Sequence, residues 1–356
     1  MRHLLFIYFV LPLTLIAQQT PLNFLGEVSG ERNEVSGMVV LPGMSQILMI
    51  EDSGNEPALA LIDYAGGFVS GVTLDNLRNR DWEDLQTDQN GFLYIGDIGN
   101  NFSDRDTMVI YRLENVAGFF ESNLTLSFDS IQFTYSDQLA EIQLNPSGNF
   151  DCEAFVVDDE VIHLYSKDHS GRNYTKHYVL PNEMGRQTAQ LIDSTQLTSW
   201  VTGAHLRHDC SQLYLCSDNR LTTFTDFSLD KIYEEYTFDT QQVESIFKDN
   251  QGRVLLVEEA EIGGGSSRLY SFHEREREPQ IRLFPNPAFH TISLRFAVPV
   301  HSISVYQSSG KRVFEAVLEI DCNAYNLDVN SFIEGRYIVF AASSGDPVIG
   351  SFIKLD

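Results

Sequence analysis

Short runs in which apolar and polar residues alternate follow one another along most of the chain, and this pattern predicts β-strands. Helical periodicity is almost absent, and Gly, Asp and Asn residues separate the runs as turns. On the order of twenty such strands lie between Phe24 and Phe272. The sequence therefore predicts an all-β protein, whose architecture depends on how the strands repeat.

One short motif recurs five times, each time ahead of a β-hairpin. It reads EVSGM at 34–38, DWEDL at 81–85, DCEAF at 151–155, WVTGA at 200–204 and QVESI at 242–246. The copies start 47, 70, 49 and 42 residues apart. Several strands in each period of this length are typical of propeller blades. The count favours a β-propeller of five four-stranded blades. Six blades are the alternative, because the longest interval contains an insert around LTLSFDSIQFTYSD.

The last repeat lacks a fourth strand, whereas an extra strand, NFLGEV at 23–28, precedes the first motif. We expect this N-terminal strand to complete the last blade and to close the ring, which leaves no exposed sheet edge.

The third residue of each motif copy defines a candidate ligand-binding or channel-facing set, to which we add Asp84. Alternation along equivalent inner strands would direct these side chains to one face. Carboxylates held so close raise one another's pKa unless a cation lies among them, and Ca²⁺ prefers such oxygen ligands. The alternative is a structural role, in which the acids accept hydrogen bonds from backbone amides. The motif residues are Ser36, Glu83, Glu153, Thr202 and Glu244.

A second group of oxygen-bearing side chains lies in the loop GDIGNNFSDRD. Asp97, Asn100 and Asp104 of this loop, with Glu83 and Glu153, are the candidate metal ligands. The spacing lacks the terminal Glu of an EF-hand loop, and Asx side chains also stabilise turns without a metal. Ca²⁺ is the cofactor that the pattern suggests, and no sequence feature indicates an organic cofactor.

Composition narrows the range of partners. The 356 residues include 50 Asp and Glu against 24 Lys and Arg, and the net charge of −26 argues against nucleic acid as a partner. Four cysteines are too few for a disulfide scaffold. Cys210 and Cys216 flank a predicted turn and either form a disulfide or remain separate thiols. We expect a monomer.

The chain begins with the pattern of a secretory signal. Arg2 and His3 precede an apolar run at residues 4–16, and Ala17 follows as a small residue for cleavage. No later run is long and apolar enough to predict a transmembrane segment. We therefore divide the chain into a signal peptide at 1–17, a propeller at 18–272, a charged linker at 273–281 and a small antiparallel β-sandwich at 282–356.

The motifs of the body resemble a known group of propellers. The segments SGMVV, IEDSGNEPALALID, RDWEDLQTDQNGFLYIGDIGNN and DCEAF resemble secreted propellers of the SdiA-regulated type, and more loosely esterase-like phytase and strictosidine-synthase-like propellers. The resemblance covers residues 34–272. Such folds host unrelated functions, so it implies architecture rather than activity.

The C-terminal segments LFPNPAFHTISLRF, SISVYQSSGKRVFE and YNLDVNSFIEGRYIVFAASSGDPVIGSFIKLD resemble the sorting domain of Bacteroidetes type IX secretion cargo. The resemblance implies recognition by the type IX secretion machinery. It also implies passage through the periplasm to the medium or to the outer-membrane surface. The final Asp356 departs from the basic residue that often ends the family. The motif residues are Pro285, Asn286, Pro287, Gly335, Tyr337 and Lys354.

Two functions fit these features. The first is a ligand- or protein-binding module that Ca²⁺ stabilises and that takes an unknown extracellular ligand. The alternative is a metal-dependent extracellular hydrolase, either phosphoesterase or phytase-like, or esterase-like. In a hydrolase, the motif glutamates should converge with a basic residue in one open pocket. In a binding module, they should be buried against backbone amides.

Overall fold

The computed structural model divides the chain into two compact units, with the boundary between Glu274 and Arg275. The predicted signal peptide lies outside the described residues. The described chain contains no helix with the length and apolar composition of a membrane span. The described residues are 18–355 apart from 31, 123, 139–148, 159–160, 170–173, 208–211, 225–226, 228, 230–231, 250–251, 261–263, 275–280, 285, 287, 309 and 344–347.

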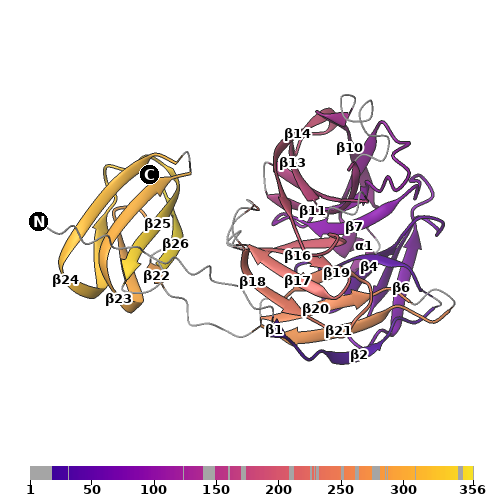
Figure 1. The fold of residues 1–356 in the computed structure, drawn as a ribbon. Coiled ribbons are helices and arrows are strands. Elements are labelled where there is room, and N and C mark those ends of the chain that lie inside the picture. The colour runs from indigo at the N-terminus through magenta and orange to yellow at the C-terminus, as the bar shows by residue number, and fades with distance from the viewer. Residues whose placement is uncertain are drawn as a thin grey trace, which may run out of the picture. The chain divides into compact units, whose positions relative to one another are not determined.

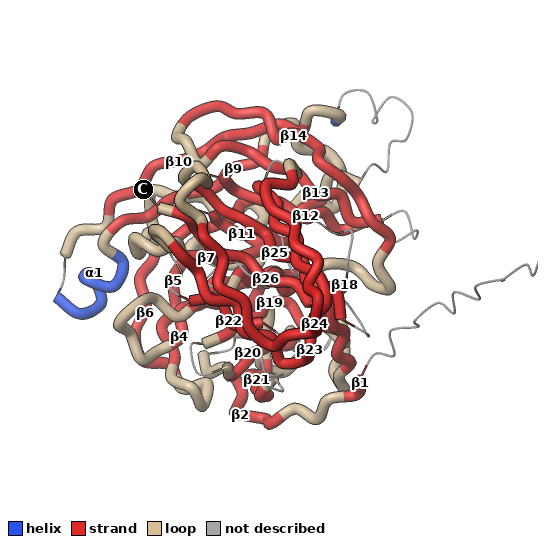
Figure 2. Tube along the Cα trace, turned by 90° about the vertical axis from the view of Figure 1, so that its left-hand side faces the viewer, coloured by secondary structure: helices blue, strands red, loops and turns tan. Residues whose placement is uncertain are grey.

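The first unit is a five-bladed propeller, nearly all of it strand (Figures 1 and 2). Blade 1 has the order β3–β4–β5–β6, at Val35–Val39, Ile47–Glu51, Ala58–Ile62 and Phe68–Thr73. Blade 2 has the order β7–β8–β9–β10, at Trp82–Thr87, Leu93–Asp97, Met108–Glu114 and Ser127–Tyr135. Blade 3 has the order β11–β12–β13–β14, at Asp151–Asp158, Val161–Lys167, Tyr174–Pro181 and Gly185–Gln196.

Blades 4 and 5 continue the ring. Blade 4 consists of β15–β16–β17–β18, at Gly203–Leu206, Leu213–Ser217, Arg220–Phe224 and Ile232–Thr237, with the short strand β1 (Gln18–Gln19) parallel to β18. Blade 5 consists of β19–β20–β21–β2, at Val243–Lys248, Arg253–Glu258, Arg268–His273 and Asn23–Glu27. Each inner strand contacts the inner strands of its two neighbours, in the closed order β3, β7, β11, β15, β19 and back to β3. The prediction of five blades is confirmed.

The N-terminal strand closes the ring as the sequence predicts. Figure 1 shows the indigo strand β2 beside the orange strand β21, and the two are antiparallel. At Gly26 in β2 the backbone passes close to blade 1, where an added Cβ would lie 1.9 Å from the carbonyl oxygen of Ala65. A glycine is needed here because any side chain would overlap that carbonyl.

The insert in the longest repeat does not form a sixth blade. It contributes the seven-residue helix α1 (Val116–Ser122) and strand β10, the outer strand of blade 2. Strand β10 also pairs in parallel with β14, the outer strand of blade 3, so blades 2 and 3 share one eight-stranded sheet. Aromatic side chains fill the space beneath this pairing, with the Tyr135 ring 4.6 Å from Tyr178 and 5.6 Å from Phe150.

The second unit is a β-sandwich-like domain of five strands: β22 (Ile281–Phe284), β23 (Thr291–Gln307), β24 (Arg312–Asp328), β25 (Gly335–Ser343) and β26 (Val348–Lys354). Register shifts around Val300 divide the long strand β23. Its first half pairs with β22 and its second half with β25. Gly350 in β26 packs against Ile281 of β22, which brings the two ends of the sheet together over one core.

The cysteines of the propeller form no described disulfide. Cys216 is a buried free thiol, and Cys210 lies outside the described residues. The burial of Cys216 raises the pKa of its thiol well above the usual range. This cysteine therefore serves as a small core residue.

Candidate functional site

A β-bulge marks the repeated motif in four of the five inner strands. The ladder register shifts at the motif residue in β3, β7, β11 and β19. A bulge leaves one residue out of the ladder and redirects its side chain. In the fourth blade, the motif residue stands just before β15. The bulged residues are Ser36, Glu83, Glu153 and Glu244.

The two hydroxyl residues of the motif connect neighbouring blades. Ser36 Oγ donates a hydrogen bond to the Trp82 carbonyl at 2.8 Å, and Thr202 Oγ1 donates to the Val243 carbonyl at 2.5 Å. Each of these carbonyls immediately precedes a motif glutamate. Ser36 and Thr202 therefore connect the inner strands of neighbouring blades, and their predicted ligand-facing role stays a prediction.

Asp84 also belongs to the scaffold. It is fully buried and accepts hydrogen bonds from the backbone amides of Leu85 at 2.7 Å and Phe155 at 3.2 Å. Burial raises the pKa of its carboxyl group to about 8, although these amides act in the opposite direction. The physical reason is the bulge: Glu83 leaves the ladder, and the next residue faces the neighbouring blade. Asp84 therefore accepts hydrogen bonds within the scaffold, and its predicted ligand-facing role stays a prediction.

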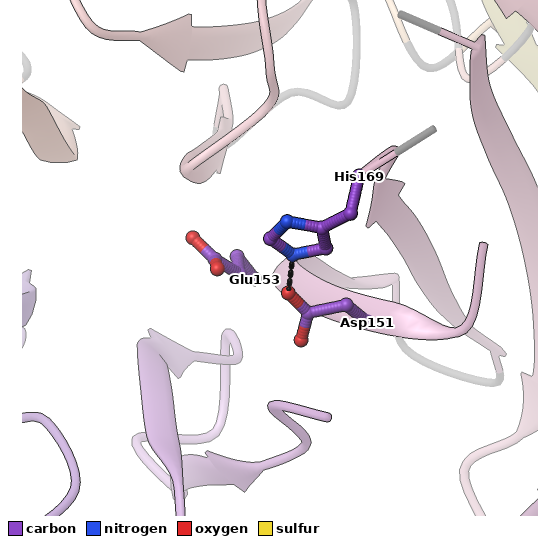
Figure 3. Close-up of side chains that lie close together, drawn as sticks. All are labelled: Asp151, Glu153 and His169. Atoms are coloured by element: carbon purple, nitrogen blue, oxygen red, sulfur yellow. Dashed lines mark hydrogen bonds and ion pairs between the residues drawn. The ribbon is translucent and has the colours of Figure 1, made fainter. Parts of the chain in front are cut away.

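Glu153 lies beside a cation of the protein itself. Lys167 Nζ is 2.6 Å from Glu153 Oε1. Burial alone lowers the pKa of Lys167, but the negative charges of Glu153 and Glu244 raise it by more, so the ammonium stays charged. Two residues before Glu153, Asp151 Oδ2 lies 2.6 Å from His169 Nε2 (Figure 3). Lys167 therefore balances charge in the acidic pair of blade 3, and His169 hydrogen-bonds to its other carboxylate.

The equivalent acidic pair of blade 2 is not balanced in this way. Oxygen atoms of Asp52, Asp81 and Glu83 lie within 4.8 Å of one another. Glu83 is only 5% exposed, and its Oε1 has no hydrogen-bond partner among the described residues. The nearby Arg105 forms its ion pair with Asp97, at 2.9 Å. A buried carboxylate oxygen without a partner is strongly unfavourable, so this cluster is incomplete as it stands.

The backbone leaves room for the two carboxylates of blade 2. A Cβ atom at Gly99 would lie 2.0 Å from Glu83 Oε1 and 2.5 Å from Asp81 Oδ2. Both oxygens therefore face the bare backbone of Gly99, where no other side chain would fit. This glycine shapes a cradle for the acidic cluster.

The acids of this region perturb one another. Burial raises the pKa of Glu83 well above its ordinary value, and the charges of Glu153 and Asp52 raise it further. Burial raises the pKa of Asp52 to about 6. Burial also raises the pKa values of Glu244 and Glu259 to about 7, and the ammonium of Lys167 opposes each shift. Burial and the neighbouring acids therefore both disfavour the charged forms of these carboxyl groups.

The loop residues predicted as metal ligands face different partners. Asp97 pairs with Arg105, and the Asn100 side-chain oxygen accepts the backbone amide of Arg105 at 3.0 Å. Asp104 is exposed and lies 3.7 Å from Arg80. Asp97 and Asn100 thus order their own loop around Arg105, and we leave all three residues out of the candidate cation site.

Asp81, Asp151, Lys167 and His169 are not among the site residues predicted from the sequence. Two of them had a readable signal, because Asp81 and Asp151 each stand two residues before a motif glutamate in a D-x-E pattern. Residues two apart on a strand share a face. Only the pairing of strands reveals Lys167 and His169.

The described sorting-motif residues meet at one end of the second unit. Gly335 is opposite Lys354 in the pairing of β25 with β26, and Tyr337 stacks on Phe352 at 5.3 Å. Asn286 Oδ1 accepts the amide of Ile353 at 2.9 Å. Pro285 and Pro287 lie outside the described residues.

A comparison with known protein families supports the prediction of a C-terminal sorting domain. Residues 282–354 match the family described as the secretion system C-terminal sorting domain. The second unit is therefore a type IX sorting domain, as predicted, and the chain is cargo for export to the cell surface or the medium.

No curated protein matches the chain. Among solved structures, a luciferin-regenerating enzyme is 13% identical with a TM-score of 0.40, and the match covers 68% of this chain and 78% of that one. A protein described as a gluconolactonase is 13% identical with a TM-score of 0.42, and the match covers 73% of this chain and 94% of that one. At these values neither likeness bears on the chemistry of the site.

Proposed function

We propose that the propeller is an extracellular binding module that holds a divalent cation among Asp52, Asp81 and Glu83. The observation that carries this proposal is the buried Oε1 atom of Glu83, which has no hydrogen-bond partner among the described residues. It lies with two further carboxylates within 4.8 Å. A cation there would supply the missing partner and offset the repulsion among the three acids.

Blade 3 provides an internal comparison. It carries the same D-x-E pair at the same bulge, and there Lys167 supplies a positive charge to Glu153 while His169 hydrogen-bonds to Asp151. Blade 2 has the acids without such partners among the described residues. The comparison supports a bound cation as the missing charge in blade 2.

Ca²⁺ fits the ligand set best. Three carboxylates provide only oxygen ligands, which suit Ca²⁺ and Mg²⁺ rather than zinc. Asp52 and Asp81 are only partly buried, so water or an extracellular ligand can complete the shell. Ca²⁺ accepts six to eight oxygens in flexible geometry, whereas Mg²⁺ demands a near-ideal octahedron. A ligand oxygen could bind the module by joining this shell.

Some observations agree with the binding module and others with the metal-dependent hydrolase. Glu83, Glu153 and Glu244 are buried, as the binding module requires, but Asp84 takes the backbone amides in their place. The charge of Lys167 acts on both Glu153 and Glu244, which brings a basic residue to the motif glutamates as a hydrolase requires, although these glutamates are buried rather than in an open pocket. This convergence keeps the metal-dependent hydrolase as the second candidate.

The direct test is calorimetric titration of the purified, EDTA-stripped protein with CaCl₂ and, separately, with MgCl₂. We expect one saturable Ca²⁺ site for each chain and weaker or undetectable Mg²⁺ binding. If no saturable heat is seen with either ion up to millimolar concentrations, the proposal is wrong. Tighter binding of Mg²⁺ would refute the choice of Ca²⁺ but support the site.

A further inference from the structure

One copy of the repeated motif begins with an exposed aromatic residue. The first motif residue is polar in four blades and aromatic in the fourth, where Trp200 is 37% exposed. An exposed indole at a position that is otherwise polar offers a flat apolar surface to a ligand. The first residues of the five copies, in chain order, are Glu34, Asp81, Asp151, Trp200 and Gln242.

Polar side chains from blade 3 surround this indole. The Trp200 ring lies 5.4 Å from the His169 ring and 5.5 Å from Lys167 Nζ. His169 Nε2 is in turn 2.6 Å from Asp151 Oδ2, and Lys167 Nζ is 2.6 Å from Glu153 Oε1. The two acids thus hold an imidazole and an ammonium beside the indole. We call Trp200, His169 and Lys167 together the Trp200 platform.

The platform offers both a hydrogen-bond acceptor and hydrogen-bond donors. Asp151 is fixed in place, because its other oxygen accepts the backbone amide of Asn100 at 2.5 Å. It accepts the Nε2 proton of His169, which leaves Nδ1 as the acceptor of the neutral ring. Figure 3 shows Nδ1 on the side of the ring away from Asp151, and the His169 side chain is 28% exposed. Lys167 supplies the donors, since only one of its three N–H groups is needed for the bond to Glu153.

We infer that the Trp200 platform binds a neutral pyranose sugar. A pyranose has an apolar face of C–H groups and a rim of hydroxyl groups, each of which both donates and accepts hydrogen bonds. The apolar face stacks on Trp200, while rim hydroxyls donate to His169 Nδ1 and accept from Lys167 Nζ. The inference rests on the proposed role of the propeller as a binding module, for which it names the ligand class. It does not depend on the bound cation.

Charge restricts the ligand to a neutral sugar. A sugar acid or sugar phosphate would bring a negative charge toward Asp151 and Glu153. An amino sugar would bring an ammonium to an indole that already has Lys167 Nζ at 5.5 Å from its ring, where a cation is attracted to the ring. A neutral sugar meets neither repulsion and retains the stacking and the hydrogen bonds.

The two tryptophans of the chain provide a readout for this inference. Trp82 is fully buried, and its indole N–H donates to the Arg78 carbonyl at 3.0 Å. A sugar in solution therefore contacts Trp200 and not Trp82, so a change in tryptophan emission reports binding at the platform. The probes for the full-length protein are methyl glucoside, methyl galactoside, cellotetraose, glucuronate and glucosamine. We expect a saturable change in emission with a neutral probe, and binding at least tenfold weaker for both charged ones.

Variants test whether the platform carries the binding. In calorimetric titration with the neutral probe that binds best, Trp200→Ala should lower the affinity on the order of tenfold or more, because it removes the stacking surface. His169→Ala should also weaken binding, because it removes the acceptor. Tyr233→Ala is the matched control: it removes an aromatic side chain of the same blade that is 40% exposed, and it should leave the affinity unchanged.

A Ca²⁺ titration of the same preparation separates this inference from the proposed cation site. If Ca²⁺ binds but no neutral sugar gives a saturable change, the carbohydrate inference is wrong and the cation site is supported. If a neutral sugar binds and Ca²⁺ does not, the inference is supported and the cation site is wrong. Undiminished affinity of Trp200→Ala, or tighter binding of glucuronate or glucosamine than of every neutral probe, also overturns the inference.

Discussion

Substituting Glu83 by Gln tests the cation site most sharply. The substitution keeps the size of the side chain and removes its charge. The folded state raises the pKa of Glu83, so it binds the Glu83 proton more tightly than the unfolded state does. The native glutamate therefore lowers the stability of the fold, and this loss grows as the pH rises above the pKa that Glu83 has in the unfolded state. In EDTA at pH 8, we expect Glu83→Gln to be as stable as the native protein or more stable.

The size of the effect follows from the spacing of the acids. Two ionised carboxylates 4.8 Å apart repel by about 3 kcal/mol at an effective dielectric constant near 20, and solvent reduces this for the partly exposed Asp52 and Asp81. A bound cation replaces this repulsion with attraction between the ion and the carboxylates. Ca²⁺ at 100 times its dissociation constant stabilises the native state by about 2.7 kcal/mol. For a unit of this size, this stabilisation corresponds to a rise in Tm of roughly 5–10 °C.

The assay is calorimetric unfolding at pH 7.5 in EDTA and in saturating CaCl₂. The native protein should show the rise in Tm, and Glu83→Gln should not. Glu153→Gln is the matched control, because it changes the same motif position in the next blade. It removes the partner of Lys167, so it should cost about 3 kcal/mol in both conditions and keep the Ca²⁺ shift.

Two results would refute this reasoning. A full Ca²⁺ shift in Glu83→Gln would mean that the ion binds elsewhere. Loss of the shift in Glu153→Gln, with its retention in Glu83→Gln, would place the ion in the Asp151–Glu153 cluster instead.

Three further predictions follow from named contacts. Gly99→Ala should weaken Ca²⁺ binding at least tenfold in a calorimetric titration, since its Cβ would displace Glu83 Oε1. Gly26→Ala should lower the free energy of unfolding, measured by urea unfolding, by about 2 kcal/mol or more, because its Cβ would overlap the Ala65 carbonyl. A variant as stable as the native protein would contradict the described closure of the ring. Burial lowers the pKa of His163 to about 3, so only the unfolded state takes up this proton as the pH falls from 6.5 toward 3, and stability falls with it. His163 should therefore cost about 2 kcal/mol of stability between pH 7 and pH 5, and His163→Gln should show a correspondingly flatter profile in urea unfolding.

The sequence by itself determined the class of the protein. Alternating polarity and the spacing of the motif copies predicted a propeller of five or six blades, with five favoured, and the strand at 23–28 predicted how the ring closes. These features are readable because strand periodicity and turn chemistry are local properties of the chain. The tail was readable for the same reason, since its turns and strands follow one another in a fixed order.

Only the tertiary structure distinguished Glu83 from Glu153. Both occupy the same motif position, two residues after an aspartate and at the same bulge. Lys167 becomes the partner of Glu153 because β11 and β12 pair so that Asp151 lies opposite Lys167. Asp52 reaches Glu83 from a different blade. The charge around a buried carboxylate depends on residues far away in the sequence, and no local pattern records which of them the fold brings near.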